Sequence, residues 1–195
     1  MTSSQGWYAG FVALVALERL AELVLAKRHA AWALSRGGVE FGRSHYPAMV
    51  ALHGALLGAA VAETLVLDRP FVPALGWPML ALAMGAQALR WWCITTLGLH
   101  WSTRVIVVPG AALVAAGPYR WLRHPNYVAV VIEGAALPLV HTAWLTAVVF
   151  TVLNAEILAV RIRVENAALA AAASSRTASA HTVPQRRVRQ PPTPR

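Results

Sequence analysis

The sequence predicts an all-α fold: an integral membrane bundle of about five transmembrane helices, the last two of which form a hairpin. Two observations support this prediction. The chain has 195 residues, of which 57% are hydrophobic and only 13% are charged, a composition too apolar for an ordinary soluble domain. The apolar residues also stand in long blocks separated by basic clusters, which is the pattern of helices that cross about 30 Å of hydrocarbon.

The apolar blocks define the expected spans. In chain order these are residues 7–26, 49–67, 73–92, 127–140 and 143–160. The first block has no charge before Glu18 and is followed by Lys27 and Arg28, unlike a cleaved secretory signal, so we expect it to be a retained span. Only His141 and Thr142 separate the last two blocks, which predicts the hairpin. Because its first arm is short, either interfacial residues extend that arm or the turn lies at or just below the far membrane surface.

The basic residues predict the orientation of the chain. Clusters of lysine and arginine follow the first, third and fifth blocks, whereas the connection between the second and third carries only Asp68 and Arg69. The positive-inside rule then places the N-terminus outside and the C-terminus in the cytoplasm. The alanine- and arginine-rich composition is typical of bacteria, so we expect a multi-pass protein of a bacterial cell membrane.

The net charge of +9 bears on possible partners. The basic residues lie between apolar blocks, without an aromatic-interleaved basic stripe, so we expect contacts with anionic membrane lipids and none with nucleic acid. The single cysteine, Cys93, excludes an internal disulfide and a multi-cysteine metal site, and we expect no metal.

Composition divides the chain into three segments. Residues 1–96 contain the first three expected spans. Residues 97–169 contain a loop rich in glycine and proline, the hairpin and a cytoplasmic helix end. Residues 170–195 turn to alanine, serine, threonine, proline and arginine without apolar periodicity, and we expect a disordered basic tail.

The segment 117–127, directly before the hairpin, is the most informative part of the sequence. Pro125 is suited to the first turn of the fourth helix. This would place His124 at a helix N-terminus, where unpaired N–H groups favour an anion such as an amino acid carboxylate, and Arg123 adds positive charge. An interfacial turn, with arginines on lipid phosphates and an aromatic belt that includes Tyr119 and Tyr127, explains the same spacing equally well.

Polar residues within the last two blocks favour a site. Glu133 lies inside the fourth block, where an ionisable group is costly without a partner or a wet cavity. Asn154, Arg161 and Glu165 are spaced to share one helix face. Asn154 and Glu156, which lie deeper in the apolar run, suggest a polar pocket open to the cytoplasm, whose carboxylate and amide oxygens suit a cationic ligand. The alternatives are packing against the acidic first helix and, for Arg161 and Glu165, a surface ion pair worth about 0.3–0.5 kcal/mol.

These residues together resemble a known family. The run Gly-Pro-Tyr at 117–119, then Arg-His-Pro at 123–125, Tyr127, an apolar hairpin and the segment from Arg161 to Glu165 resemble the isoprenylcysteine carboxyl methyltransferases and their bacterial relatives, which include lipid O-methyltransferases. The resemblance covers residues 97–169. The sequence departs from the family pattern at Asn166, where a second acidic residue is usual, and in the tail, where an aromatic-containing segment often follows.

The resemblance implies an S-adenosylmethionine-dependent methyltransferase whose cofactor lies between the cytoplasmic surface and the hairpin. A lipophilic acceptor would enter from the membrane. His124, Pro125 and Tyr127 fall on the family's cofactor motif, and Arg161 and Glu165 fall near its closing signature. With the polar residues noted above, the expected cofactor site is Tyr119, Arg123, His124, Pro125, Tyr127, Glu133, Asn154 and Glu165, and the expected catalytic residues are His124, Arg161 and Glu165.

The sequence does not decide between two chemical classes of methyl acceptor. An isoprenylcysteine carboxylate is already a nucleophile, whereas the hydroxyl of a lipidic phenol or polyketide must lose its proton, for which His124 would be the most natural base. Other functions are a small transporter or scaffold, a phospholipid N-methyltransferase, or a membrane reductase of related architecture. No internal repeat or pair of broken helices favours the transporter.

Overall fold

The computed structural model describes the backbone of residues 2–181 and the side chains of all of these except 173 and 175–181. The described residues form five α-helices, which are α1 (Ser3–Ser35), α2 (Tyr46–Val66), α3 (Pro73–Leu97), α4 (Pro125–Leu139) and α5 (Trp144–His181). Three short 3-10 helices accompany them: η1 (Arg43–His45), η2 (Gly98–His100) and η3 (Gly117–Arg120). Each of the five apolar blocks of the sequence is therefore a helix, as predicted.

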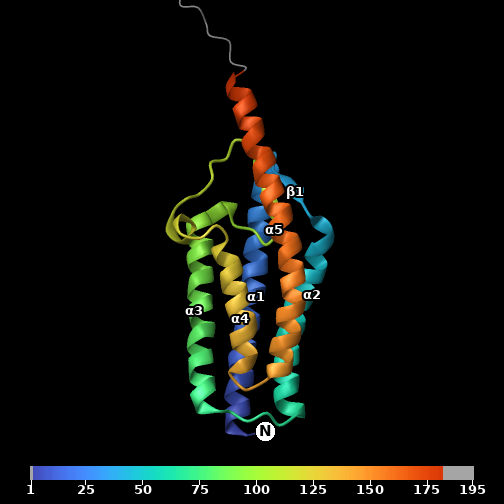
Figure 1. Cartoon of the computed structure of the whole chain (residues 1–195), viewed down its shortest axis with the longest axis vertical. Helices are drawn as coiled ribbons and strands as arrows, with labels where there is room; N and C mark the ends of the chain where they lie inside the picture. Colours follow the sequence, from blue (N-terminus) through green and yellow to red (C-terminus); the bar gives the residue numbers. More distant parts are fainter. Residues whose placement is uncertain (1, 182–195) are drawn as a thin grey trace, which may run out of the picture.

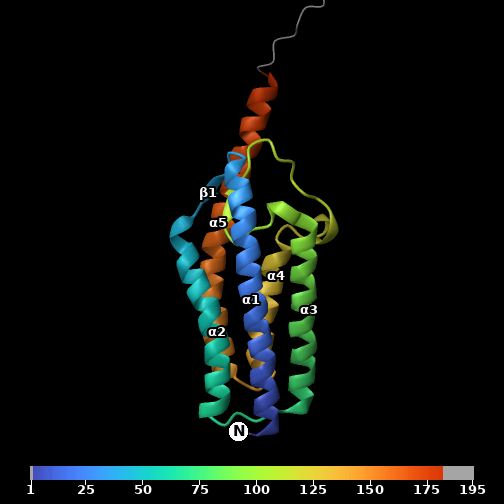
Figure 2. The same cartoon turned by 180° about the vertical axis from the view of Figure 1, so that it is seen from behind.

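The five helices run side by side along the long axis of the molecule (Figure 1). The N-terminus and the α2–α3 and α4–α5 connections lie at one end. The long α3–α4 connection lies at the other end, beside which α5 projects beyond the bundle (Figures 1 and 2). We call this second end the loop end of the bundle. α4 packs against α3, α5 and α2, so the shortest of the five helices is the central one.

A small antiparallel sheet also lies at the loop end and was not predicted. β1 (Val39–Phe41) pairs with β2 (Val105–Val107) in the register Val39↔Val107 and Phe41↔Val105. The pairing ties the α1–α2 connection to the α3–α4 connection. It therefore gives the loop region a fixed position against the bundle.

Two helices are long and apolar enough to cross a membrane by length and composition. These segments are Arg43–Val66, with a mean hydropathy of 1.7, and Trp144–Ala172, with a mean hydropathy of 1.8. α4 is apolar but has 15 residues, so it rises only about 22 Å against about 30 Å of hydrocarbon. The turn that follows it, which includes His141 and Ala143, is buried in the bundle. The hairpin turn is therefore enclosed by the other helices at the end of the bundle opposite the loop end.

A network of buried polar residues joins α1, α3 and α4 in the middle of the bundle. Glu133 of α4 forms ion pairs with Arg19 of α1, at 2.7 Å, and with Arg90 of α3. Arg19 also pairs with Glu22 and donates to Gln87. Because charge in an apolar interior is costly without a partner, these contacts fix the three helices relative to one another.

The last helix continues further than the sequence predicts. α5 runs to His181, whereas a disordered tail is expected from residue 170. Alanine has the highest helix propensity, and residues 167–173 contain six alanines in a helix that the apolar block has already nucleated. Residues 182–195, the remainder of the expected tail, lie outside the described residues.

Candidate functional site

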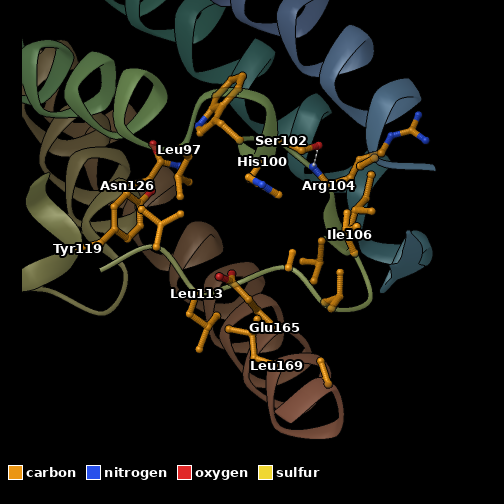
Figure 3. A pocket seen from close by; sticks show the side chains of 18 of the residues that line it. Leu97, His100, Ser102, Arg104, Ile106, Leu113, Tyr119, Asn126, Glu165 and Leu169 are labelled. Carbon is orange, nitrogen blue, oxygen red and sulfur yellow. Dashed lines mark hydrogen bonds between the residues drawn. The ribbon is translucent and has the colours of Figure 1, made fainter. Parts of the chain in front are cut away.

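A cavity of about 510 Å³ opens at the loop end of the bundle. Figure 3 shows its walls: the segment with His100, Ser102, Arg104 and Ile106, the segment with Tyr119 and Asn126, and the face of α5 with Glu165. Its lining joins parts of the chain that are far apart in sequence, since α1 also contributes. The polar lining residues are His29, His100, Ser102, Arg104, Tyr119, Arg123, His124, Asn126, Tyr127, Arg161, Glu165 and Asn166.

Two prolines and a glycine shape the chain before α4. Pro125 is buried at the first position of α4, where a missing N–H costs no helical hydrogen bond, and His124 is the N-cap residue, as predicted. Gly117 begins η3 with a φ of 52°, and a Cβ there would lie 2.5 Å from the hydroxyl of Thr96. This glycine lets η3 pack against α3. Pro118, the second residue of η3, is buried.

His124 faces two acceptor oxygens on α5. Its Nδ1 lies 3.5 Å from Oε1 of Glu165, and its Nε2 lies 3.3 Å from Oδ1 of Asn166. The imidazole also stacks on the ring of Tyr127, with the centroids 5.2 Å apart. Since carboxylate and amide oxygens accept hydrogen bonds, His124 acts as a donor to α5 in this arrangement.

Tyr127 connects Arg161 and Glu165, two charged residues of α5. Nε of Arg161 donates to the phenolic oxygen of Tyr127 at 2.8 Å, and the same hydroxyl donates to Oε2 of Glu165. The guanidinium also donates to the sulfur of Met49 at 3.0 Å. Arg161 and Glu165 therefore do not form the direct surface ion pair that their spacing allows. They are joined through the hydroxyl of Tyr127, which lies on α4.

Tyr119 and Asn126 bring further polar groups to the wall. Burial, with the neighbouring Cys93 and Glu165, raises the pKa of Tyr119 well above its usual range, so its phenol stays protonated. Oδ1 of Asn126 is buried and has no hydrogen-bond partner among the described residues. An unpaired buried acceptor costs about 1–3 kcal/mol, so this oxygen is suited to a donor group of a ligand.

The structure assembles most of the expected site. Six of the expected residues line the cavity: Tyr119, Arg123, His124, Tyr127, Arg161 and Glu165. Pro125 supports them from beneath, at the start of α4.

Glu133 and Asn154, which we expected in the cofactor site, are not part of the cavity lining. Glu133 lies two turns down α4 and is neutralised by Arg19 and Arg90. Asn154 is buried at a separate, smaller groove between α4 and α5, beside Val131 and Phe150. The helix periodicity placed Asn154 on the face of Arg161 correctly, but the seven-residue spacing carries it about 10 Å further along the axis.

Sequence reasoning missed the contribution of α1 and of the segment 97–114. His29 lines the cavity from α1, and Ser102, Arg104 and the strand β2 line it from the α3–α4 connection. Arg104 pairs with Glu40 at 3.4 Å and lies over the ring of Tyr46. None of these residues stands in a recognisable motif; the contact of His29 with Trp101 and the pairing of β1 with β2 are tertiary contacts that accompany their placement at the site.

Comparison with known proteins shows a family match that includes much of the cavity lining. The family model of the isoprenylcysteine carboxyl methyltransferase (ICMT) family matches residues 79–171, a range that contains every cavity residue contributed by η3, α4 and α5 except Ala172. The uncharacterized protein YpbQ of Bacillus subtilis is 36% identical over 159 residues, which are 81% of this chain and 94% of that protein.

A second relative extends the comparison. An uncharacterized protein of Haemophilus influenzae is 27% identical over 162 residues, which are 82% of this chain and 92% of that protein. No solved structure matches this chain. The chain belongs to the isoprenylcysteine carboxyl methyltransferase family, a family of membrane-embedded methyltransferases.

Proposed function

We propose that this protein is an S-adenosylmethionine-dependent methyltransferase that methylates an oxygen of a lipophilic acceptor. One observation carries the proposal: the chain of contacts from Arg161 through Tyr127 to Glu165 and His124 lines a cavity inside the segment that matches the family. The acceptor is either an isoprenylcysteine carboxylate or the hydroxyl of a lipidic phenol or polyketide.

The described residues suit the methyl donor, which carries a sulfonium, an ammonium and a carboxylate. The cavity of about 510 Å³ lies within the usual range for small-molecule sites, about 300–1,000 Å³. Glu165 offers negative charge to a cationic group, and Arg123, which is exposed at the cavity, offers positive charge to a carboxylate. The unpaired Oδ1 of Asn126 accepts from an N–H or O–H group.

S-adenosylmethionine supplies an electrophilic methyl group when bound. The residues of the chain bind and orient the reactants, because an in-line displacement depends mainly on alignment. Tyr127 donates a hydrogen bond to Glu165, and Nδ1 of His124 lies 3.5 Å from the other carboxylate oxygen, so the Glu165 carboxylate is held from two sides. Arg161 in turn holds Tyr127. The apolar side chains of β2 and Leu169 exclude water from the same cavity.

We further propose five membrane spans in a bacterial cell membrane, with the N-terminus outside and the C-terminus in the cytoplasm. The connections at the loop end carry five arginines, whereas the two connections at the opposite end carry only one, Arg69, and the site would then face the cytoplasm. Both relatives are bacterial proteins. A lipophilic acceptor would reach the cavity from the adjoining leaflet, and anionic lipids would contact the basic connections.

A labelled-methyl assay tests the proposal. Purified protein in detergent is incubated with methyl-labelled S-adenosylmethionine and bacterial lipid extract, and the labelled products are separated and treated with mild base. We expect label in the lipid fraction. A methyl ester releases its label in base, whereas a methyl ether keeps it. Absence of labelled lipid, in a preparation that binds the cofactor, would contradict the proposed acceptor, and absence of binding would contradict the proposed function.

A further inference from the structure

We infer that His29 of α1 is the catalytic base, and that the acceptor is a neutral hydroxyl compound whose proton His29 removes. This inference rests on the proposed function. His29 lines the same cavity as His124 and Glu165 but lies on a helix outside the segment that matches the family. Its side chain is largely buried, with 9% of the residue exposed.

The hydrogen bond of His29 fixes its tautomer. Its Nδ1 lies 2.9 Å from the backbone oxygen of Trp101. A carbonyl oxygen can only accept, so Nδ1 carries the hydrogen and the neutral ring has its lone pair on Nε2. Within residues 2–181 no group is hydrogen-bonded to Nε2, and this atom is not among the fully buried unpaired atoms. Nε2 is therefore a free acceptor at the cavity wall.

The surroundings of His29 hold the ring in place. The indole of Trp101 meets the imidazole edge to face, with centroids 6.3 Å apart. Trp101 itself packs in an apolar cluster with Ala26 and Ile94. A general base needs this kind of fixed orientation, because proton transfer requires a hydrogen bond of about 2.6–3.2 Å to the acceptor.

His124 is less suited to the same task. Both of its ring nitrogens face acceptor oxygens on α5, those of Glu165 and Asn166. Neither nitrogen then presents a free lone pair to a hydroxyl group. His124 and His29 thus differ in kind: both ring nitrogens of His124 face oxygens of α5, whereas His29 has a hydrogen-bond partner among the described residues on one side only.

The arginines of the cavity also favour a neutral acceptor. Arg104 is paired with Glu40, and Arg161 is bonded to Tyr127 and Met49. Arg123 is the remaining arginine of the lining, and the proposed function assigns it to the carboxylate of the methyl donor. A carboxylate acceptor would therefore need an arginine that already has another partner. A hydroxyl acceptor needs only a proton acceptor, which His29 supplies.

The proposed step couples removal of the acceptor proton by His29 to transfer of the methyl group. Nε2 of His29 takes the proton of the acceptor hydroxyl as the oxygen attacks the methyl carbon in line with the carbon–sulfur bond. The new oxygen–carbon bond forms, the carbon–sulfur bond breaks, and its electron pair remains on sulfur, which becomes a neutral thioether. His29 is left as an imidazolium and returns its proton to water after the methyl ether leaves.

The variant His29→Asn separates catalysis from structure. The asparagine amide can take the place of Nδ1 and donate to the oxygen of Trp101, but it has no counterpart of Nε2. His53→Asn is the matched control, because Nδ1 of His53 likewise bonds a backbone oxygen, that of Met49, and the ring packs edge to face on Phe150 outside the cavity lining. Thermal unfolding of both variants in detergent checks that they are folded.

The first readout needs no methyl donor. A dodecyl nitrophenol is bound to the cofactor-free protein at a fixed pH near its own pKa, and the ionised fraction is read from visible absorbance. We expect a larger ionised fraction on wild type and His53→Asn than on His29→Asn, equivalent to a pKa of the analogue about one unit lower. Equal ionised fractions on wild type and His29→Asn would overturn the inference.

The second readout is methyl transfer to three probes: a dodecylphenol, its ionised nitro derivative, and N-acetyl-S-farnesylcysteine, which offers a carboxylate. The hydroxyl of the dodecylphenol is neutral at pH 7.5, because a phenol has a pKa of about 10. We expect His29→Asn to lower kcat for the dodecylphenol by about 100-fold or more. Transfer to the nitrophenolate should change less than about threefold.

Each contrary result has a distinct meaning. Equal losses for the phenol and the nitrophenolate in folded His29→Asn would show a structural role and overturn the inference. Transfer by wild type to the farnesylcysteine alone would also overturn it, while the proposed function would stand. A wild-type protein that binds no S-adenosylmethionine would instead contradict the proposed function itself.

Discussion

The phenolic oxygen of Tyr127 lies 2.8 Å from Nε of Arg161, and its hydroxyl also donates to Glu165. One hydroxyl thereby joins the first turn of α4 to the charged face of α5. The ring of Tyr127 additionally supports His124 by stacking. The position of the Glu165 carboxylate in the cavity therefore depends on Tyr127.

Tyr127→Phe should weaken cofactor binding. The variant keeps the ring that stacks on His124 but loses the bonds to Arg161 and Glu165, and bonds to charged groups are worth about 1.5–3 kcal/mol. We expect the Kd for S-adenosylmethionine to rise about tenfold or more in a calorimetric titration. Tyr8→Phe is the control, since its hydroxyl bonds the backbone oxygen of Leu137 at the opposite end of the bundle. Equal affinities of the two variants would contradict the role of Tyr127.

Glu133→Ala should destabilise the bundle without weakening cofactor binding. The substitution leaves Arg19 and Arg90 buried without their carboxylate, and breaking a buried pair costs about 3–5 kcal/mol. In a chain of this size we expect the unfolding midpoint in detergent to fall by roughly 10 °C. The Kd for S-adenosylmethionine should stay within about threefold of wild type. A large loss of affinity for S-adenosylmethionine at unchanged stability would instead indicate that Glu133 belongs to the cofactor site.

Cysteine labelling should report opposite sides of the membrane for the two ends of the bundle. Val72 lies in the α2–α3 connection and is 41% exposed. Ala116 is exposed in the α3–α4 connection at the loop end. In intact cells we expect Val72→Cys to react with a membrane-impermeant maleimide and Ala116→Cys to react only after permeabilisation. Wild type sets the background, because Cys93 is fully buried.

The reverse pattern of labelling would contradict the proposed orientation and would place the cavity outside the cytoplasm. Equal labelling of both cysteines in intact cells would contradict the transmembrane arrangement of these connections. Both outcomes are read from the same gel, so the experiment tests span placement and orientation together.

The five helices follow from the sequence because each apolar block exceeds the length that a helix needs to be stabilised by packing. The ends of the helices are predicted less well from the sequence. Pro125 marks the start of α4 correctly, since proline is suited to the first turn. The three-residue strands β1 and β2 leave no periodic pattern, and the paired residues are 64 to 68 positions apart in the chain, as Val39↔Val107 and Phe41↔Val105 show. Such pairing depends on tertiary contacts that local sequence does not contain.

The site follows from sequence only where its residues stand close together in the chain. His124 and Tyr127 lie in one short segment, and Glu165 shares a helix face with Arg161, so motif and periodicity suffice. Periodicity gives a face but neither depth nor partner, which is why Glu133 was assigned to the cofactor and is instead paired with Arg19 and Arg90. His29 has no local signal at all.

Calorimetric titration of the purified full chain with S-adenosylmethionine tests the central claim most directly. We expect saturable binding by wild type and by Glu156→Gln, whose carboxylate is exposed on α5 outside the cavity. His124→Ala and Glu165→Ala, checked for folding by thermal unfolding, should bind at least about tenfold more weakly, because each removes a charged or hydrogen-bonded partner from the cavity wall. Unchanged affinity in both alanine variants, or no saturable binding by wild type, would contradict the account.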